Sequence, residues 1–395
     1  METGKMATEA IKNLILSYLP EMTEFRHAMH ENPELSGKET ATSARIATLL
    51  EQYGYEVTRH IGGNGIVASL KNGNGRKSIG IRADMDALPI REETDLEYAS
   101  KNEGVMHACG HDGHTTTLLT AARALAATKN FDGTVHLIFQ PAEEIGAGAK
   151  AMINDGLFER FPCDAVYGLH NWPGLEQGKI QFTKKAMMAS VDKATIVIYG
   201  KGGHGARPES AIDPVIVASS IVMALQTIVS RNVPPLQSAI ISTDSIHGGE
   251  AFNIIPDSVT ISLTVRSFSA DIQNLVEERI KQIVEAQAKS FGATASVNYE
   301  RLVPAVVNHP DHSDFALHVA KHVLGADRVV ETEIPTTVSE DFAFMLEARP
   351  GAFFFLGNGD SASLHSPHYN FDDQNIIDGA VFWCALVEAS LNNRN

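Results

Sequence analysis

The chain has few cysteines, and those it has are far apart. Among 395 residues there are three, Cys109, Cys163 and Cys384. An odd number of widely spaced cysteines disfavours a disulfide framework and indicates a reducing compartment, so we expect a cytoplasmic protein. The surroundings of Cys163 and Cys384 are apolar, which predicts that both are small core residues.

Basic residues and long hydrophobic runs are also scarce. Lys and Arg number 32 against 48 Asp and Glu, which gives a formal net charge of -16. Because no basic excess is available to neutralise phosphates, we expect no nucleic-acid partner. No apolar run approaches the roughly 18 residues of a membrane span, so we expect no membrane partner either. The net charge does not exclude an anionic small-molecule substrate, since a local site can be positive inside an acidic protein.

The length and composition predict a globular protein with a large core and more than one domain. Hydrophobic residues make up 44% and charged residues 20% of the chain. Strand patterns occur at 56–61, 65–71, 78–86, 134–140 and 164–170, and helix patterns at 113–128 and 147–157. Strands separated by helices predict an α/β domain with a mainly parallel sheet.

The pattern changes near residue 187. Strands are predicted at 193–200, 238–246, 258–267 and 294–300, and helices at 211–231 and 270–291. The order βαββαβ is typical of the ferredoxin-like α+β arrangement, with two helices on one face of a four-stranded antiparallel sheet. We therefore predict a discontinuous first domain, residues 1–186 and 298–395, and an inserted domain, residues 187–297.

Side chains that can bind metals follow the predicted strands and turns of the first domain at five places. Open α/β sheets bind ligands at the carboxyl ends of their strands, so these side chains are expected at one edge. Chance readily supplies one such coincidence, but not five. The five places hold Asp84 and Asp86, Cys109 and His111, Glu143 and Glu144, His170, and His365 with His368.

The residue types fit one another chemically. Thiolate, imidazole and carboxylate groups suit zinc and its transition-metal neighbours. In an extended segment Cys109 and His111 point to the same side, so we expect both to reach one pair of metals. Two metals roughly 3.5–4 Å apart can clamp both oxygens of a tetrahedral intermediate. Adjacent side chains diverge in extended backbone, so one of Glu143 and Glu144 can bind metal while the other serves as a general base.

The segment 104–116, GVMHACGHDGHTT, also admits other interpretations. Cys109 paired with a histidine is a possible nucleophile of a metal-free cysteine amidase. Asp112 precedes a helical pattern and could be only its N-cap or a brace. His107 and His114 receive no assigned role beyond support of the neighbouring ligands.

The inserted domain carries a polar cluster of its own. His204 lies in a glycine-rich loop, GKGGHGARP, where the backbone can approach a ligand closely. Asn253 and Arg266 lie at or near strand positions. The planar fork of an arginine matches a carboxylate, although a lone arginine on the outer face of the sheet is the alternative.

Taken together, these segments resemble the M20 family of dinuclear metallohydrolases. The similarity runs from about Phe25 to Phe382, and it is greatest to the branch of aminoacylases, hippurate hydrolases and plant auxin-conjugate amidohydrolases. The motifs, in order, are RADMDALPI, GVMHACGHDGHTTTLLTAARAL, FQPAEE, GLHNWPGLEQGKI, GKGGHGARPESAIDPV, FNIIPDSV, SEDFAFM and LHSPHYNFDD.

The resemblance implies a role for each matching residue of the first domain. Glu143 would be the general base and acid, and Asp86 would support a metal ligand without touching the metal. Asp84 stands where many M20 peptidases have a metal-binding histidine. Two divalent ions per subunit, zinc, manganese or cobalt, would be held by Cys109, His111, Glu144, His170 and His365.

The resemblance also assigns the inserted domain to lid and dimerisation functions. It implies a homodimer, or a tetramer, in which His204 reaches the neighbouring subunit's site and stabilises the oxyanion. Asn253 and Arg266 would hold the carboxylate of the substrate. Ile145 and Ala147 stand where the family pattern has glycine, so we expect a differently shaped loop beside the acyl pocket.

We therefore predict a metal-dependent amidohydrolase of the aminoacylase type. It would hydrolyse the amide bond of an N-acyl or N-aroyl amino acid to a carboxylic acid and a free amino acid. A dipeptidase or carboxypeptidase on the same scaffold is the first alternative. The metal-free cysteine amidase is the second, and a catalytically silent binding protein is the third.

Overall fold

The computed structural model describes residues 2–392 and divides the chain into two compact units. The first unit comprises Met1–Lys185, Asn308–Ile334 and Asp341–Asn395, and the second comprises Ala186–Val307 and Pro335–Glu340. The second unit extends beyond the expected 187–297, because its last long strand continues to Val303 and a short segment near residue 335 joins it.

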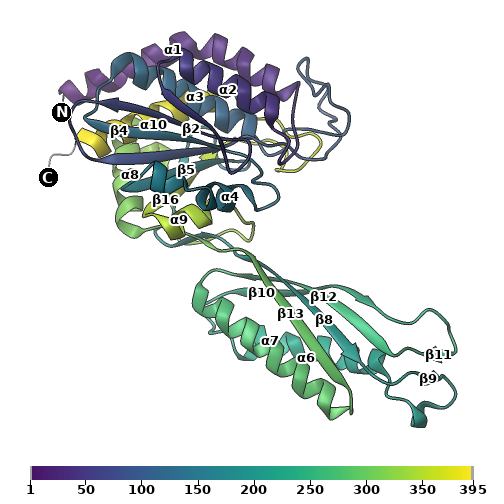
Figure 1. Ribbon diagram of the computed structural model, residues 1–395. Coiled ribbons are helices and arrows are strands. Elements are labelled where there is room, and N and C mark those ends of the chain that lie inside the picture. The colour runs from purple at the N-terminus through teal and green to yellow at the C-terminus, as the bar shows by residue number, and fades with distance from the viewer. Residues whose placement is uncertain (1, 393–395) are drawn as a thin grey trace. The chain divides into compact units, whose positions relative to one another are not determined.

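An eight-stranded sheet forms the centre of the first unit (Figure 1). In spatial order its strands are β1 (Glu56–Ile61), β2 (Gly65–Asn72), β4 (Gly133–Gln140), β3 (Ser78–Asp84), β5 (Ala165–Trp172), β16 (Gly351–Gly357), β6 (Ile180–Phe182) and β15 (Val329–Glu331). The central strands β4, β3, β5 and β16 are mutually parallel, as are β6 and β15, whereas the other pairs are antiparallel. This confirms the predicted α/β class with a mainly parallel sheet.

Helices cover both faces of this sheet, and α1 and α3 lie opposite α4 and α9 in Figure 1. Buried Leu118 and Leu125 of α3 share one hydrophobic core with Cys384 of α10. The helix predicted over 147–157 is divided in two at Gly156, which has a φ of 83°. The helices are α1 (Glu2–His30), α2 (Thr40–Gln52), α3 (His111–Thr128), α4 (Gly148–Asn154), α5 (Leu157–Arg160), α8 (Pro310–Val323), α9 (Ala343–Ala348) and α10 (Gln374–Asn392), with a short 3-10 turn η2 (Ala326–Arg328).

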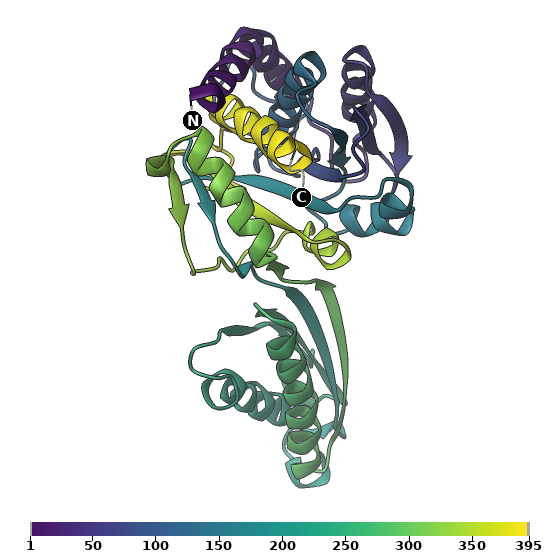
Figure 2. The ribbon, with the colours of Figure 1, turned by 90° about the vertical axis from the view of Figure 1, so that its left-hand side faces the viewer.

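The second unit has the predicted ferredoxin-like arrangement. Its four-stranded antiparallel sheet runs in the order β10 (Ala239–His247), β12 (Ser258–Ser267), β8 (Val191–Tyr199) and β13 (Thr294–Val303). Helices α6 (Pro214–Arg231) and α7 (Ala270–Ser290) lie on the same side of the strands (Figure 2). Short elements complete the unit: β7 (Ala186–Met188), β9 (Gly203–His204), η1 (Pro208–Ser210), β11 (Ile254–Ile255) and β14 (Val306–Val307).

Helix α6 corrects the expectation that no apolar run is long enough to span a membrane. Its 18 residues have a mean hydropathy of 1.5, so length and composition alone would permit a span. This is weak evidence, since an apolar helix in a protein core meets the same criterion. One stripe of α6, including Ile221 and Leu225, is buried in the core of the second unit. Ile216 and Met223 on the remaining surface are exposed.

Candidate metal centre

The polar side chains expected at one edge of the sheet do gather there. Asp84 ends β3, Glu143 and Glu144 follow β4, and His170 lies near the end of β5. Because these strands are parallel neighbours, their carboxyl ends lie together. His365 follows β16, the next parallel strand of the sheet.

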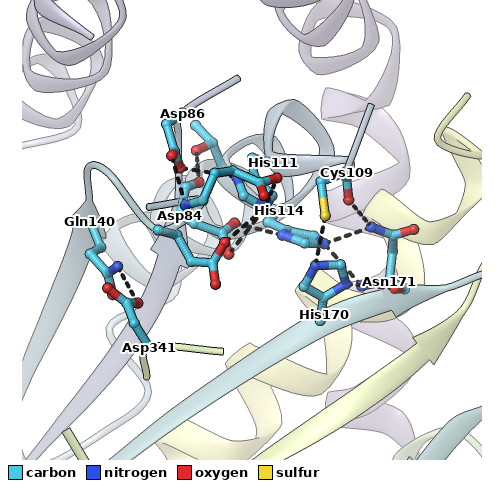
Figure 3. A network of polar contacts seen from close by, with 12 residues as sticks. Asp84, Asp86, Cys109, His111, His114, Gln140, His170, Asn171 and Asp341 are labelled. Atoms are coloured by element: carbon cyan, nitrogen blue, oxygen red, sulfur yellow. Dashed lines mark hydrogen bonds and ion pairs between the residues drawn. The ribbon is translucent and has the colours of Figure 1, made fainter. Parts of the chain in front are cut away.

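The Sγ atom of Cys109 lies 3.3 Å from the Nε2 atom of His170, and both residues are buried (Figure 3). The Nδ1 atom of His170 lies 2.6 Å from the backbone oxygen of Asn171 and donates to it. The lone pair of Nε2 is therefore free to face the thiol. Burial, with the neighbouring His114, lowers the pKa of His170 well below its ordinary value. His170 is thus neutral, as a metal ligand must be.

His111 is surrounded by carboxylates. Its Nδ1 atom is 3.1 Å from Oδ1 of Asp86, and its Nε2 atom is 3.7 Å from Oε1 of Glu144. Burial lowers the pKa of His111, but the carboxylates of Asp84, Asp86 and Glu144 outweigh burial and raise it to about 10. Such an excess of negative charge favours a cation at this place.

Two buried atoms of neighbouring candidate ligands make no hydrogen bond within residues 2–392. They are Nε2 of His111 and Oε1 of Glu144. Buried polar atoms normally have hydrogen-bond partners, so a nitrogen and an oxygen without such partners, 3.7 Å apart, fit the role of ligands to a cation.

The candidate ligand atoms form overlapping groups that share members. In each group the ligand atoms lie within 4.8 Å of one another. Three of the groups combine the expected ligands: Cys109 with His111 and His170, Cys109 with Glu144 and His365, and His111 with Glu143 and Glu144. Two further groups are Asp84 with His111 and His114, and Glu143 with Glu340 and Asp341. Nitrogen, sulfur and oxygen donors in this proportion fit zinc-like ions, and the shared members fit two neighbouring ions. The side chain of His365 is 53% exposed, so the cluster is open to solvent on that side within its unit.

The backbone at Cys109 differs from the extended segment expected from the sequence. Gly110 has a φ of 87°, and His111 is already the first residue of α3. A Cβ atom on Gly110 would lie 2.3 Å from Nδ2 of Asn171 and 2.5 Å from the hydroxyl of Tyr369. Cys109 and His111 therefore converge through a left-handed turn that requires glycine, not through the alternation of a strand.

The segment that holds Glu143 and Glu144 is also a turn, not extended backbone as expected. The backbone nitrogen of Gly146 donates to the oxygen of Glu143 at 2.7 Å, which closes the turn. Buried Glu39 accepts from the nitrogen of Ala142 at 2.8 Å, and this bond fixes the start of the loop. Ile145 projects from this fixed loop with 66% of its surface exposed.

Asp86 connects two of the candidate ligands. Its carboxylate accepts from Nδ1 of His111, and it accepts from the backbone nitrogen of Glu144 at 3.0 Å. The hydroxyl of Ser36 donates to it at 2.6 Å. Burial raises the pKa of Asp86, but the hydrogen bond from His111 outweighs burial and the pKa is lowered. The ionised carboxylate therefore holds the imidazole of His111 and the loop of Glu144 in place.

Asp84 and His114 form a second support, whose partners the sequence did not identify. Nδ1 of His114 is 2.6 Å from Oδ1 of Asp84, and Nη1 of Arg82 is 2.7 Å from Oδ2. The backbone nitrogen of Asn171 donates to Nε2 of His114 at 2.9 Å. The lone pair of His114 is therefore occupied, so this histidine supports the cluster and is a poor metal ligand.

Asp112 braces α3 and does not cap it. The N-cap position is Gly110, and no side chain caps the helix. The carboxylate of Asp112 instead accepts from Arg26 at 3.0 Å and lies 2.8 Å from Nδ1 of His30, both in α1. His107 is buried, and its ring nitrogens make no hydrogen bond in the described part of the chain. Burial lowers its pKa to about 4, so it is neutral.

The other site residues proposed from the sequence belong to the second unit. His204 ends β9 and is exposed, and its Nδ1 atom accepts from the backbone nitrogen of Ala206 at 3.0 Å. Its proton therefore lies on Nε2, which can donate to a ligand. Asn253 is exposed in the turn before β11. Arg266 lies on β12 between buried Val265 and Ser267, so it points away from the helix-covered face of the sheet.

Residues 80–389 match the sequence profile of Peptidase family M20/M25/M40. The chain belongs to this family. The match confirms the resemblance on which the sequence analysis rested, and it covers the candidate metal centre as well as the second unit.

Individual relatives support the same assignment. The chain is 46% identical to a hippurate hydrolase of Campylobacter jejuni over 94% of this chain and 97% of that protein. It is 40% identical to an N-acetyl-L-cysteine deacetylase of Bacillus subtilis, over 90% of this chain and 85% of that protein. A dinuclear metal-binding peptidase of the M20 family from Bacillus subtilis has a similar structure. Its TM-score is 0.86 at 31% identity, over 96% of this chain and 99% of that one.

Proposed function

We propose that this chain is a metal-dependent amidohydrolase that cleaves N-acyl or N-aroyl amino acids into a carboxylic acid and a free amino acid. The observation that carries the proposal is the buried cluster of candidate ligands with Glu143 beside it. The names of the hippurate hydrolase and the N-acetyl-L-cysteine deacetylase supply the substrate class, since both describe N-acylated amino acids.

The ligands in this proposal are Cys109, His111, Glu144, His170 and His365, and the ions are two of zinc, manganese or cobalt. When bound, such ions polarise a carbonyl group and acidify water, which prepares both for reaction. Two of the three histidines have their other ring nitrogen engaged: Nδ1 of His111 by Asp86, and Nδ1 of His170 by the backbone oxygen of Asn171. These bonds fix the tautomer that offers Nε2 as a ligand atom.

Glu143 acts as the general base and acid. Its Oε2 atom is 4.0 Å from Nε2 of His111, and its side chain is 11% exposed, so it borders both the cluster and the solvent. It accepts a proton from the attacking water and returns the proton to the leaving nitrogen. A positioned carboxylate of this kind contributes about 10²- to 10⁴-fold to the rate.

Cys109 is a ligand and not a nucleophile in this proposal. Burial and the nearby carboxylates of Glu144 and Glu143 raise the pKa of its thiol well above the ordinary value. A neutral thiol is a weak nucleophile, whereas a metal ion would stabilise the thiolate as a ligand. This argues against the metal-free cysteine amidase.

The second unit serves as the lid and the dimerisation domain in this proposal, and the protein is a cytoplasmic homodimer. The exposed apolar residues of α6, including Ile216 and Met223, offer surface for a second copy of the chain. His204 donates through Nε2 to the oxyanion in the neighbouring subunit's site. Asn253 and Arg266 bind the α-carboxylate of the substrate. Solution mass measurements test the dimer independently of activity.

A substrate panel on defined metal-loaded enzyme tests the proposed reaction. The purified protein is stripped with a chelator and reloaded with zinc, manganese or cobalt, and release of free amino acid is measured. We expect turnover of N-acetyl and N-benzoyl amino acids that disappears on chelation and returns with metal. Faster turnover of free dipeptides would favour the dipeptidase alternative. Turnover that survives chelation would favour the cysteine amidase, and no turnover of any member would favour the binding protein.

A further inference from the structure

Asn171 lies at the meeting point of three segments that carry candidate ligands. It directly follows His170 on β5, and its side-chain nitrogen donates to the backbone oxygen of Cys109 at 2.6 Å (Figure 3). Its side-chain oxygen accepts from the hydroxyl of Tyr369 at 2.6 Å, and Tyr369 lies on the same loop as His365. One amide side chain therefore joins the segments of Cys109, His170 and His365.

The backbone of Asn171 is engaged in the same cluster. Its oxygen accepts from Nδ1 of His170, which leaves Nε2 of that ring to face Cys109. Its nitrogen donates to Nε2 of His114, and the side-chain nitrogen lies 2.9 Å from the same atom. Since His114 in turn bonds Asp84, Asn171 also ties the end of β5 to the end of β3.

The side chain of Asn171 is closely packed. Asn171 and Tyr369 are both buried, with no exposed surface. A Cβ atom on Gly110 would overlap the side-chain nitrogen of Asn171 and the hydroxyl of Tyr369. The turn between Cys109 and His111 is therefore shaped directly against this pair of side chains. A change at Asn171 is transmitted to the backbone that orients both ligands.

We propose that Asn171, held by Tyr369, is a positioning residue that sets the geometry and the affinity of the metal centre. This inference rests on the proposed function, because it assumes that Cys109, His170 and His365 bind metal. It does not make Asn171 a ligand, since its side-chain atoms are already engaged by Cys109, His114 and Tyr369.

A buried asparagine can also matter only for folding, so the test needs a control of that kind. Asn308 is the matched residue: it is buried, and its side-chain nitrogen donates to the oxygens of Thr183 and Phe353 at 2.9 and 3.0 Å. Its side-chain oxygen accepts from the nitrogen of Phe353 at 2.7 Å. The partners of these three hydrogen bonds, Thr183 and Phe353, are not candidate metal ligands.

The experiment compares Asn171→Leu with Asn308→Leu in the full-length protein. Leucine has nearly the shape of asparagine without its polar atoms, and it adds no charge. Zinc affinity is measured by competition with a chromophoric chelator, and the melting temperature is measured on metal-free protein. The cobalt-loaded protein supplies a third readout, because a bound thiolate gives a charge-transfer absorption band.

We expect Asn171→Leu to weaken zinc binding by about 10- to 100-fold, as is typical when a residue that orients a ligand is lost. The cobalt–thiolate band should shift or weaken. Asn308→Leu should lower the melting temperature of the metal-free protein and leave zinc affinity and the cobalt band unchanged. Tyr369→Phe removes one hydrogen bond only and should give a smaller loss of affinity. Tyr369→Phe replaces Asn171→Leu as the test variant if Asn171→Leu does not fold.

Equal zinc affinities of the folded Asn171 and Asn308 variants would overturn the inference. If Asn171→Leu does not fold, a Tyr369→Phe variant with the zinc affinity of the wild type would overturn it. In either case the wild type would still bind metal and hydrolyse acyl amino acids, so the proposed function would stand. A wild type that binds no zinc, manganese or cobalt would overturn both.

Discussion

Oε2 of Glu144 lies 3.3 Å from Nε2 of His365, while the other oxygen of the same carboxylate faces a different imidazole, that of His111 at 3.7 Å. One carboxylate therefore borders two candidate ligand groups. His365 belongs to the group with Cys109 and Glu144 only, and it is the most exposed member of the cluster. This arrangement predicts that the two ion positions can be emptied separately.

Replacement of His365 by alanine should reduce the bound metal from two ions to one per chain. The group of Cys109, His111 and His170 keeps all its members in this variant, so one ion should remain. Metal analysis after gel filtration gives the stoichiometry. The matched change His170→Ala should empty the other position. Loss of both ions from each variant would contradict the separation of the two groups.

Glu143→Gln should remove catalysis without removing metal. The amide keeps the shape of the side chain but cannot accept the proton of water, so we expect turnover to fall by about 10²- to 10⁴-fold. The ratio of metal to protein should not change. Glu144→Gln is the control, because it alters a candidate ligand and should lower metal content. A Glu143→Gln enzyme with full metal and near wild-type turnover would rule out the assigned base.

Gly110→Ala should disrupt the metal centre through its steric overlap with Asn171 and Tyr369. Gly104 provides the control, since its φ of 77° is similarly left-handed but a Cβ there meets nothing within 4 Å. Each alanine carries about 1–2 kcal/mol of left-handed strain. Only in Gly110→Ala does the new Cβ atom also overlap neighbouring side chains. Zinc affinity and thermal unfolding of the two variants should therefore differ, with zinc binding impaired only at Gly110. Equal zinc affinities would show that the turn adapts.

Several parts of this site were predictable from the sequence because strand topology determines them. Parallel strands that end in acids or histidines must bring those ends together, and so Asp84, Glu144 and His170 could be placed at one edge. The strands of the second unit were predictable because buried residues alternate with less buried ones along them, as on β12. Their order with the two helices then indicated the ferredoxin-like arrangement.

Other parts depend on tertiary packing that no local pattern reveals. The left-handed turn at Gly110 follows from the side chains of Asn171 and Tyr369, which are distant in sequence. The support that His114 gives to Asp84 and Asn171 crosses two strands and a helix. One signal was available for Asn171: it directly follows a candidate ligand at the end of a strand, where an amide can reach neighbouring segments.

His30 should make the stability of the protein depend on pH. Burial lowers its pKa, but the charge of Asp112 and the hydrogen bonds that His30 donates to Asp112 and Glu92 outweigh burial and raise it to about 9. The pKa of His30 is higher in the folded protein than the value of about 6.5 expected in the unfolded chain, so protonated His30 stabilises the fold. This stabilisation is complete at pH values below about 6.5, and it is lost as the pH rises through about 9. The shift corresponds to roughly 3 kcal/mol.

The comparison of wild type with His30→Gln isolates this contribution. We expect the free energies of unfolding to differ most near pH 6 and to converge toward pH 10, because glutamine does not titrate. Groups that titrate in both proteins cancel in the difference. Chemical denaturation at several pH values, under one metal condition, provides the measurement. A difference that is constant with pH would show that folding does not raise the pKa of His30.

Ile145 should influence which acyl groups the enzyme accepts. It is an exposed aliphatic side chain directly after Glu143 and Glu144, on a loop fixed by Glu39 and by the closed turn at Gly146. Contact between a benzoyl group and this surface would remove apolar area from water, worth about 25 cal/mol per Å². Ile145→Gly should therefore lower kcat/KM for N-benzoyl amino acids by roughly 10-fold relative to N-acetyl amino acids. Ile334→Gly, which changes another exposed isoleucine on a different loop, is the control and should leave the ratio unchanged. An unchanged ratio in the Ile145 variant as well would mean that the acyl group does not contact this loop.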